Sequence, residues 1–202
     1  FKWKMTSSFW VVDIVRECYR IPEVREILKM EKEFSYVTYM HSISTAIFST
    51  MIVDSYTQDW NKVKKVTIGA LMHDVGKAAI AKEVLEKKGT LTQEEFKSIK
   101  KHCVYGIRMI DGMFDEEIED IVLMHHEKLD GSGYPNGITD IPLYVQIVTV
   151  ADMYDALVSN RCYKKAYSHE KAIEILRKEA NNHKINPDYV ERINKMRNPN
   201  DK

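Results

Sequence analysis

The stretch Met72-His73-Asp74-Val75-Gly76-Lys77 comes at the end of a segment, residues 59–75, whose apolar side chains follow a helical spacing. The same spacing of three and four residues recurs through most of the 202-residue chain, and no sustained alternation of period two appears. This pattern predicts an all-α fold, with a histidine and an aspartate side by side near one helix end. A chain of this length is typical of a single domain.

Start and stop signals divide the chain into the expected helices. Thr92 and Glu95 form a capping box, and Ser168 and Asn186 are residue types that cap helix N-termini. Three glycines and a proline fall within residues 130–137, so a long loop is expected there. We expect helices near residues 8–19, 22–31, 34–57, 59–75, 81–88, 92–110, 115–127, 142–159, 168–180 and 187–196.

Composition excludes several classes of protein. The 30 Lys and Arg residues balance the 30 Asp and Glu residues, so no net charge draws the chain to a nucleic-acid polymer or to anionic lipid. No apolar stretch reaches the about 20 residues of a membrane span. The three cysteines form no CxxC pair, which favours a reducing compartment and a cytoplasmic location. The chain starts at Phe1 and is compatible with a piece of a longer protein.

Five of the seven histidines fall in four expected helices with apolar patterning. A single histidine in such a helix is more often a core residue with a hydrogen-bond partner than a ligand. Five that face inward, together with Asp74 and Asp152, supply the nitrogen and oxygen donors that suit iron, manganese or zinc. The five are His41, His73, His102, His125 and His126, whereas His169 and His183 are expected at the surface without a role.

Asp152 strengthens the prediction of a metal site. It lies within the apolar run Val148-Thr149-Val150-Ala151-Asp152-Met153, where an unpaired charge costs several kcal/mol and a metal removes that cost. Five neutral imidazoles and two carboxylates carry a charge of about −2, and two divalent ions bring the site to about +2. Such a site attracts an anion. The donor set therefore predicts a two-metal phosphodiester hydrolase.

Residues 73–77 and the segment His125-His126-Glu127-Lys128-Leu129-Asp130-Gly131-Ser132-Gly133-Tyr134-Pro135 resemble the HD-GYP domain, the phosphodiesterase branch of the HD superfamily. The resemblance extends from about Tyr36 to Leu176. It implies a compact HD-superfamily helical bundle with a GYP-containing loop between helices. We expect this domain to span residues 36–196. The amphipathic patterning of residues 1–35 predicts a helical segment that packs on the domain, with a partner-facing helix as the alternative, and the polar tail over 197–202 is expected to fray.

The resemblance also implies an activity. Members of the family hold two or three iron or manganese ions and open cyclic di-GMP to linear pGpG, in some cases continuing to GMP, and some prefer cyclic GMP-AMP. Asp74 would bridge two ions and act in catalysis with Lys77, which would contact the scissile phosphate. The implied metal ligands are His41, His73, Asp74, His102, His125, His126 and Asp152. The implied substrate contacts are Lys77, Gly133, Tyr134, Pro135, Arg161 and Lys164.

Two positions depart from the family pattern. Three-metal members carry a glutamate four residues before the first histidine, and Val37 occupies that position here, which predicts two ions and puts cleavage of pGpG to GMP in doubt. Cys162 replaces a common proline without a chemical consequence that we can name. The expected ions are iron or manganese, with zinc or nickel as alternatives in a purified sample.

Other readings stay open at this point. From the sequence alone, Lys77 could equally be a solvated surface lysine, and Arg161 and Lys164 could be ordinary cations at a helix end. Tyr134 could stack on a purine of the substrate or pack its loop onto the body of the domain. The chain could be a signalling module that binds a cyclic dinucleotide or a partner without catalysis, or a hydrolase of another nucleotide such as cyclic GMP-AMP. The expected partners are receiver, sensor or GGDEF domains, fused or separate, and a second copy in a homodimer.

Overall fold

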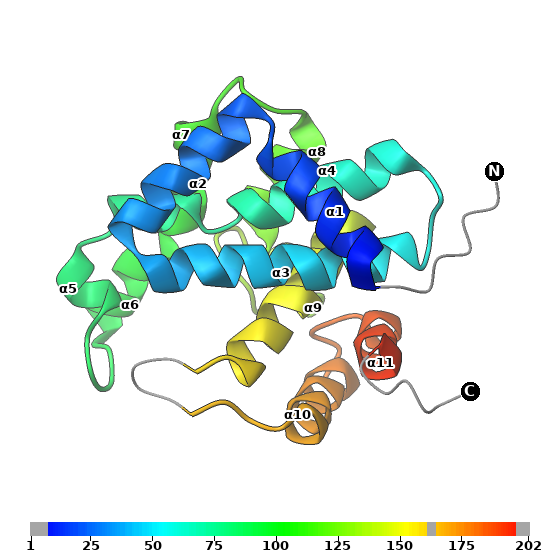
Figure 1. Ribbon diagram of the computed structural model, residues 1–202. Helices are drawn as coiled ribbons and strands as arrows, with labels where there is room; N and C mark the ends of the chain where they lie inside the picture. The colour runs from blue at the N-terminus through cyan, green and yellow to red at the C-terminus, as the bar shows by residue number, and fades with distance from the viewer. Residues whose placement is uncertain (1–7, 161–164, 197–202) are drawn as a thin grey trace.

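The computed structural model describes residues 8–160 and 165–196, and within these ranges it contains helices and loops but no strand (Figure 1). The expected all-α class is confirmed. The elements are α1 (Ser8–Tyr19), α2 (Pro22–Phe34), α3 (Tyr36–Asp54), α4 (Trp60–Met72), the 3₁₀ turn η1 (Val75–Ala79), α5 (Lys82–Leu85), α6 (Gln93–Lys100), α7 (His102–Ile110), α8 (Glu116–Met124), α9 (Leu143–Val158), α10 (His169–Asn181) and α11 (Pro187–Met196).

The core forms where α3 packs against α4 and α9. Ile52 of α3, Leu71 of α4 and Val148 of α9 are completely buried in one cluster. Removing this apolar surface from water is the main favourable contribution to the stability of the bundle. The same three helices also carry or precede predicted site residues, so the core holds these side chains in place.

The two N-terminal helices bury their apolar faces in the same cluster. Ile14 belongs to α1 and Leu28 to α2, and both are buried among residues of the later helices. Near its end, α2 also carries a buried acidic side chain, Glu31, which accepts a hydrogen bond from Ser42 of α3 at 3.1 Å. The segment 8–35 is therefore in contact with the interior of the bundle and not only with its surface.

The helix expected over 92–110 is in fact two helices, α6 and α7, that meet at Lys101. Close packing accompanies this break: a Cβ on Gly76 would lie 1.9 Å from the carbonyl oxygen of His102, so the backbones of η1 and α7 are in contact. The predicted capping box is confirmed, since Glu95 N donates to Thr92 Oγ1 at 3.2 Å and Thr92 N donates to the Glu95 carboxylate at 2.7 Å. His102 thus becomes the first residue of α7.

The expected helices over 59–75 and 81–88 are also shorter in the structure, where α4 ends at Met72 and α5 spans one turn. The shorter α4 leaves His73 and Asp74 at the point where the chain turns into η1. None of the helices in the described part of the chain combines the length and the apolar character needed to cross a membrane.

Candidate metal centre

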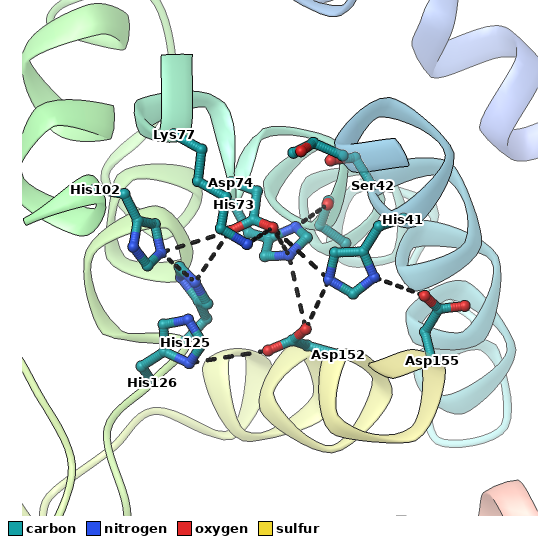
Figure 2. Close-up of polar contacts among 12 residues, drawn as sticks. His41, Ser42, His73, Asp74, Lys77, His102, His125, His126, Asp152 and Asp155 are labelled. Carbon is teal, nitrogen blue, oxygen red and sulfur yellow. Dashed lines mark hydrogen bonds and ion pairs between the residues drawn. The ribbon is translucent and has the colours of Figure 1, made fainter. Parts of the chain in front are cut away.

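The structure brings all seven predicted metal ligands together (Figure 2). They form two groups, one of Asp74, His102, His125 and His126 and the other of His41, His73 and Asp152. Within each group, the candidate ligand atoms lie within 4.8 Å of one another. Five elements supply them: α3, the turn after α4, the start of α7, the turn after α8, and α9.

Asp74 lies between the two groups, and its two carboxylate oxygens face different imidazoles (Figure 2). Oδ1 lies 3.5 Å from Nε2 of His102 and 4.0 Å from Nε2 of His125. Oδ2 lies 3.4 Å from Nε2 of His73 and 3.7 Å from Nε2 of His41. A carboxylate in this position can offer one oxygen to each of two cations.

Backbone carbonyls fix the orientation of three of the histidines. Nδ1 of His73 donates to the carbonyl of Ala70 and Nδ1 of His102 to that of Ile99, both at 2.7 Å. Nδ1 of His125 donates to the carbonyls at the end of α8 at 3.1 Å. Because a carbonyl can only accept, the proton of each neutral imidazole is on Nδ1, and Nε2 is left with a free lone pair.

Burial keeps these imidazoles neutral. It lowers the pKa of His102 to about 4 and that of His126 to about 3, and it also lowers the pKa values of His73 and His125. A charged imidazole here would lose its hydration, and the attraction of the nearby carboxylates does not make up for that loss. Neutral imidazole is the form of histidine that binds a metal.

The free lone pairs of these buried atoms are suited to binding cations. Nε2 of His102 and Nε2 of His125 lie 3.2 Å apart, and because neither carries a hydrogen, they cannot bond to each other. Nε2 of His73 and Oδ1 of Asp74 are buried with no hydrogen-bond partner. Buried polar atoms are normally satisfied. Divalent ions among these atoms would satisfy them, so the residues present fit a two-metal centre.

His41 differs from the other four histidines because carboxylates face both of its nitrogens. Nδ1 lies 2.6 Å from Oδ2 of Asp155, and Nε2 lies 2.9 Å from Oδ1 of Asp152. Burial lowers the pKa of His41, but the hydrogen bonds to the two carboxylates outweigh burial and raise it to about 9. A cation bound at Nε2 would take the place of a proton, so metal uptake at this histidine releases one.

Asp155 is a site residue that the sequence reasoning missed. Its buried carboxylate orients His41 on one side and accepts a hydrogen bond from Ser159 Oγ at 3.0 Å on the other. Partners of this kind fix the tautomer of a ligating histidine. The signal was available, because Asp155 follows Asp152 by three residues and therefore shares its face of an apolar helix.

Lys77 reaches the centre of the cluster, where its ammonium forms an ion pair with Oδ2 of Asp74. Its side chain is only 18% exposed, so it is not a solvated surface lysine. Burial raises the pKa of Asp74, but Lys77 and the surrounding imidazoles outweigh burial and hold it well below its usual range. Asp74 is therefore a carboxylate at neutral pH.

The loop that contains Gly133, Tyr134 and Pro135 folds back over the residues after His126. The buried Glu127 carboxylate accepts hydrogen bonds from the backbone nitrogens of Asn136 and Gly137 at 2.7 and 3.0 Å. Gly133 has to be glycine, because a Cβ there would lie 2.4 Å from Cα of Glu127. Glu127 thus holds the loop against the metal centre.

Tyr134 lies on a predicted metal ligand. Its ring stacks on that of His126, with 4.6 Å between the centroids and 30° between the planes. Nζ of Lys100 lies over the same ring at 4.9 Å from the centroid. These contacts favour packing against His126 over stacking on a purine.

Some predicted residues fall elsewhere. Arg161, Cys162 and Lys164 lie outside the described residues. His169 is not a plain surface residue, because its Nδ1 lies 2.9 Å from the hydroxyl of Tyr154 and its ring is partly buried between α9 and α10. His169 is the first residue of α10, directly after the N-cap Ser168, and this start of the helix faces Tyr154 of α9. His183 is exposed, as expected.

Comparison with known proteins gives the family. The HD domain family model matches residues 22–189. The chain belongs to the HD domain family. Bd1817, described as an HDG"Y"P protein from Bdellovibrio bacteriovorus, shares its fold with a TM-score of 0.65 at 19% identity, over 94% of this chain and 69% of that one.

Two curated relatives of this HD domain have names that state a substrate. A cyclic di-GMP phosphodiesterase from Thermotoga maritima is 37% identical over 156 residues, which cover 74% of this chain and 42% of the relative. The 3'3'-cGAMP-specific phosphodiesterase 2 of Vibrio cholerae is 32% identical over 159 residues, which cover 76% of this chain and 30% of the relative. The HD-GYP resemblance is confirmed, and the chain spans less than half the length of these relatives.

Proposed function

We propose that this HD domain is a metal-dependent phosphodiesterase that opens cyclic di-GMP to linear pGpG. The observation that carries the proposal is the position of Asp74, whose two oxygens face separate groups of imidazoles. The name of the Thermotoga maritima relative supports cyclic di-GMP as the substrate. Cyclic GMP-AMP is the second candidate, because another relative is named for it.

The reaction adds water across one phosphodiester bond: oxygen bonds to phosphorus, the ribose oxygen leaves, and that oxygen takes up a proton. When bound, two divalent ions supply Lewis-acid chemistry for this step. Lys77 lies beside the carboxylate between the two ligand groups, so its ammonium stabilises the negative charge that grows on the phosphoryl oxygens. Asp155 holds the proton of His41 on Nδ1, and Tyr134 holds the ring of His126 in place.

We assign the ligand set to two ions of iron or manganese. The candidate donors are imidazole nitrogens and carboxylate oxygens, which suit these ions. Val37, one turn before His41 on α3, has no oxygen to offer a third ion. With two ions, we expect pGpG to accumulate and little GMP to form.

The remaining assignments rest on the resemblance and, for the location, on the cysteine pattern. We propose residues 36–196 as the phosphodiesterase domain, a cytoplasmic location, and Gly133, Pro135, Arg161 and Lys164 as contacts of the substrate. Receiver, sensor or GGDEF domains, fused or separate, and a second copy of the chain are the proposed partners. Light scattering of the purified protein tests the homodimer.

Product analysis tests the activity. Protein purified without oxygen and loaded with iron or manganese is incubated with cyclic di-GMP, beside an Asp74→Ala variant, and the products are separated by chromatography. We expect pGpG from the intact protein only, with two ions per chain by elemental analysis. Two bound ions without any product would instead favour a signalling module that binds its nucleotide without catalysis.

A further inference from the structure

A large hollow adjoins the metal centre on the side of α5 and α6. This lateral pocket, a cavity of about 870 Å³, lies between the start of α3, residues 82–93, and the side chains of Phe96 and Ile99 on α6. Figure 1 shows α5 and α6 at the end of the bundle where α3 begins. Lys77 belongs to the wall of the lateral pocket and also pairs with Asp74. The pocket therefore reaches the predicted site of the scissile phosphate.

The walls of the lateral pocket include exposed apolar side chains from two helices. Val37 of α3 is 53% exposed, and Phe96 of α6 is 47% exposed. Both are therefore open to a ligand, although most side chains of this type are buried elsewhere in the described chain. An aromatic ring and a branched aliphatic group offer the surface on which a planar base packs.

Lysines on the other wall give the lateral pocket a positive side. Lys82 and Lys87 have carboxylate partners, Glu86 at 3.6 Å and Glu95 at 2.7 Å. Lys88, also part of the lining, forms no ion pair within the described part of the chain. Its ammonium is therefore available to an anion that enters the pocket.

We propose that the lateral pocket binds the half of the cyclic dinucleotide that is not being cleaved. Its base packs on Phe96 and Val37, and its phosphate pairs with Lys88. The inference rests on the proposed function, because it takes one phosphate of the ring to be held beside Lys77. A cyclic dinucleotide carries its second phosphate and base within a few bonds of the first, and a cavity that shares Lys77 with the metal centre lies within that reach. The volume lies in the range of ligand sites.

Assays with two substrates distinguish an effect on the lateral pocket from an effect on the metal centre. Cyclic di-GMP fills both, whereas bis(p-nitrophenyl) phosphate is a small diester that has neither a second phosphate nor a base. We expect Phe96→Ala to raise KM for cyclic di-GMP about fivefold or more. Lys88→Gln should raise the same KM and make it less sensitive to salt. Both variants should leave kcat/KM for bis(p-nitrophenyl) phosphate unchanged.

Tyr36→Ala is the matched control, since Tyr36 neighbours Val37 on α3, is exposed and does not line the pocket. Tyr36→Ala should change neither KM for cyclic di-GMP nor kcat/KM for bis(p-nitrophenyl) phosphate. Unchanged KM values for cyclic di-GMP in both pocket variants would overturn the proposal. Equal losses with both substrates would also overturn it, because Phe96 would then act through Lys100 and Tyr134 on the metal centre.

A failure of the pocket proposal can be distinguished from a failure of the proposed phosphodiesterase activity. If the intact protein hydrolyses neither substrate, the phosphodiesterase assignment fails, and calorimetric titration with cyclic di-GMP then tests the lateral pocket alone. Weaker binding to Phe96→Ala than to the intact protein would support the pocket. Equal binding to both proteins, or binding to neither, would overturn it.

Discussion

The carboxylate of Asp155 lies 2.6 Å from Nδ1 of His41 and thereby turns Nε2 of that histidine toward Asp152 and Asp74. Asp155 is not among the residues grouped as metal ligands. Its effect on the centre is indirect, through the orientation and the basicity of His41. Two substitutions at this position separate the hydrogen bond from the charge.

Asp155→Ala removes the acceptor and should weaken metal binding about 10- to 100-fold, the usual effect of losing a partner of a ligating histidine. Asp155→Asn keeps an acceptor oxygen without the charge, so its loss should be smaller. Competition with a chelator measures both affinities. Equal affinities in the intact protein and in Asp155→Ala would show that His41 is oriented by the fold alone.

Because Tyr134 stacks on His126, we expect substitutions of this tyrosine to affect metal content and activity together. Tyr134→Phe keeps the ring and should retain metal content and activity. Tyr134→Ala uncovers His126 and should lower both. If the tyrosine instead served as a platform for a purine, Tyr134→Ala would raise KM while the metal content stayed at that of the intact protein.

The ligands could be found from sequence because each one breaks a local pattern. A charged or titratable side chain at an apolar position of a helix is costly unless something pairs with it, and this identified Asp152 and the inward-facing histidines. The helical period also placed their helices, since burial of one face is visible in the sequence alone. Both kinds of signal are local.

The missed features depend on contacts between distant segments. Glu31 looks like one more acidic residue in the run Met30-Glu31-Lys32-Glu33, and only the packing of α2 on α3 buries it beside Ser42. The break at Lys101 likewise follows no helix-breaking residue type, and it occurs where Gly76 brings η1 against α7. Neither contact has a signature in the spacing of apolar residues.

Glu31 gives the metal-free protein a distinct dependence on pH. Burial, and after it the charge of Asp74, raises the pKa of this carboxyl to about 8, whereas in the unfolded chain it titrates near 4.5. Between these values the folded state holds a proton that the unfolded state has lost. The contribution of Glu31 to stability is therefore complete below pH 4.5 and is lost as the pH rises through 8.

The substitution Glu31→Gln keeps the size and shape of the side chain, but the amide cannot ionise. Its free energy of unfolding should match that of the intact protein near pH 4.5 and exceed it increasingly up to pH 8, by about 1.4 kcal/mol per pH unit. Urea unfolding in the presence of a chelator measures the difference. Glu33→Gln, a change of the same type at an exposed position of α2, is the control and should add no such slope. A constant difference between Glu31→Gln and the intact protein would contradict the raised pKa.

Lys77 is predicted to act in the transition state and not in holding metal. Its ammonium pairs with Asp74 but donates no lone pair, so Lys77→Met should leave two ions bound. Because a positioned donor near a phosphoryl oxygen contributes most when charge develops there, kcat should fall about 100-fold with a smaller change in KM. Lys171→Met removes an exposed lysine of α10 that does not line the lateral pocket, and it should leave kcat unchanged. Loss of metal in Lys77→Met would mean that the lysine holds the Asp74 carboxylate in place for metal binding, and the proposed contact of Lys77 with the phosphate would be wrong.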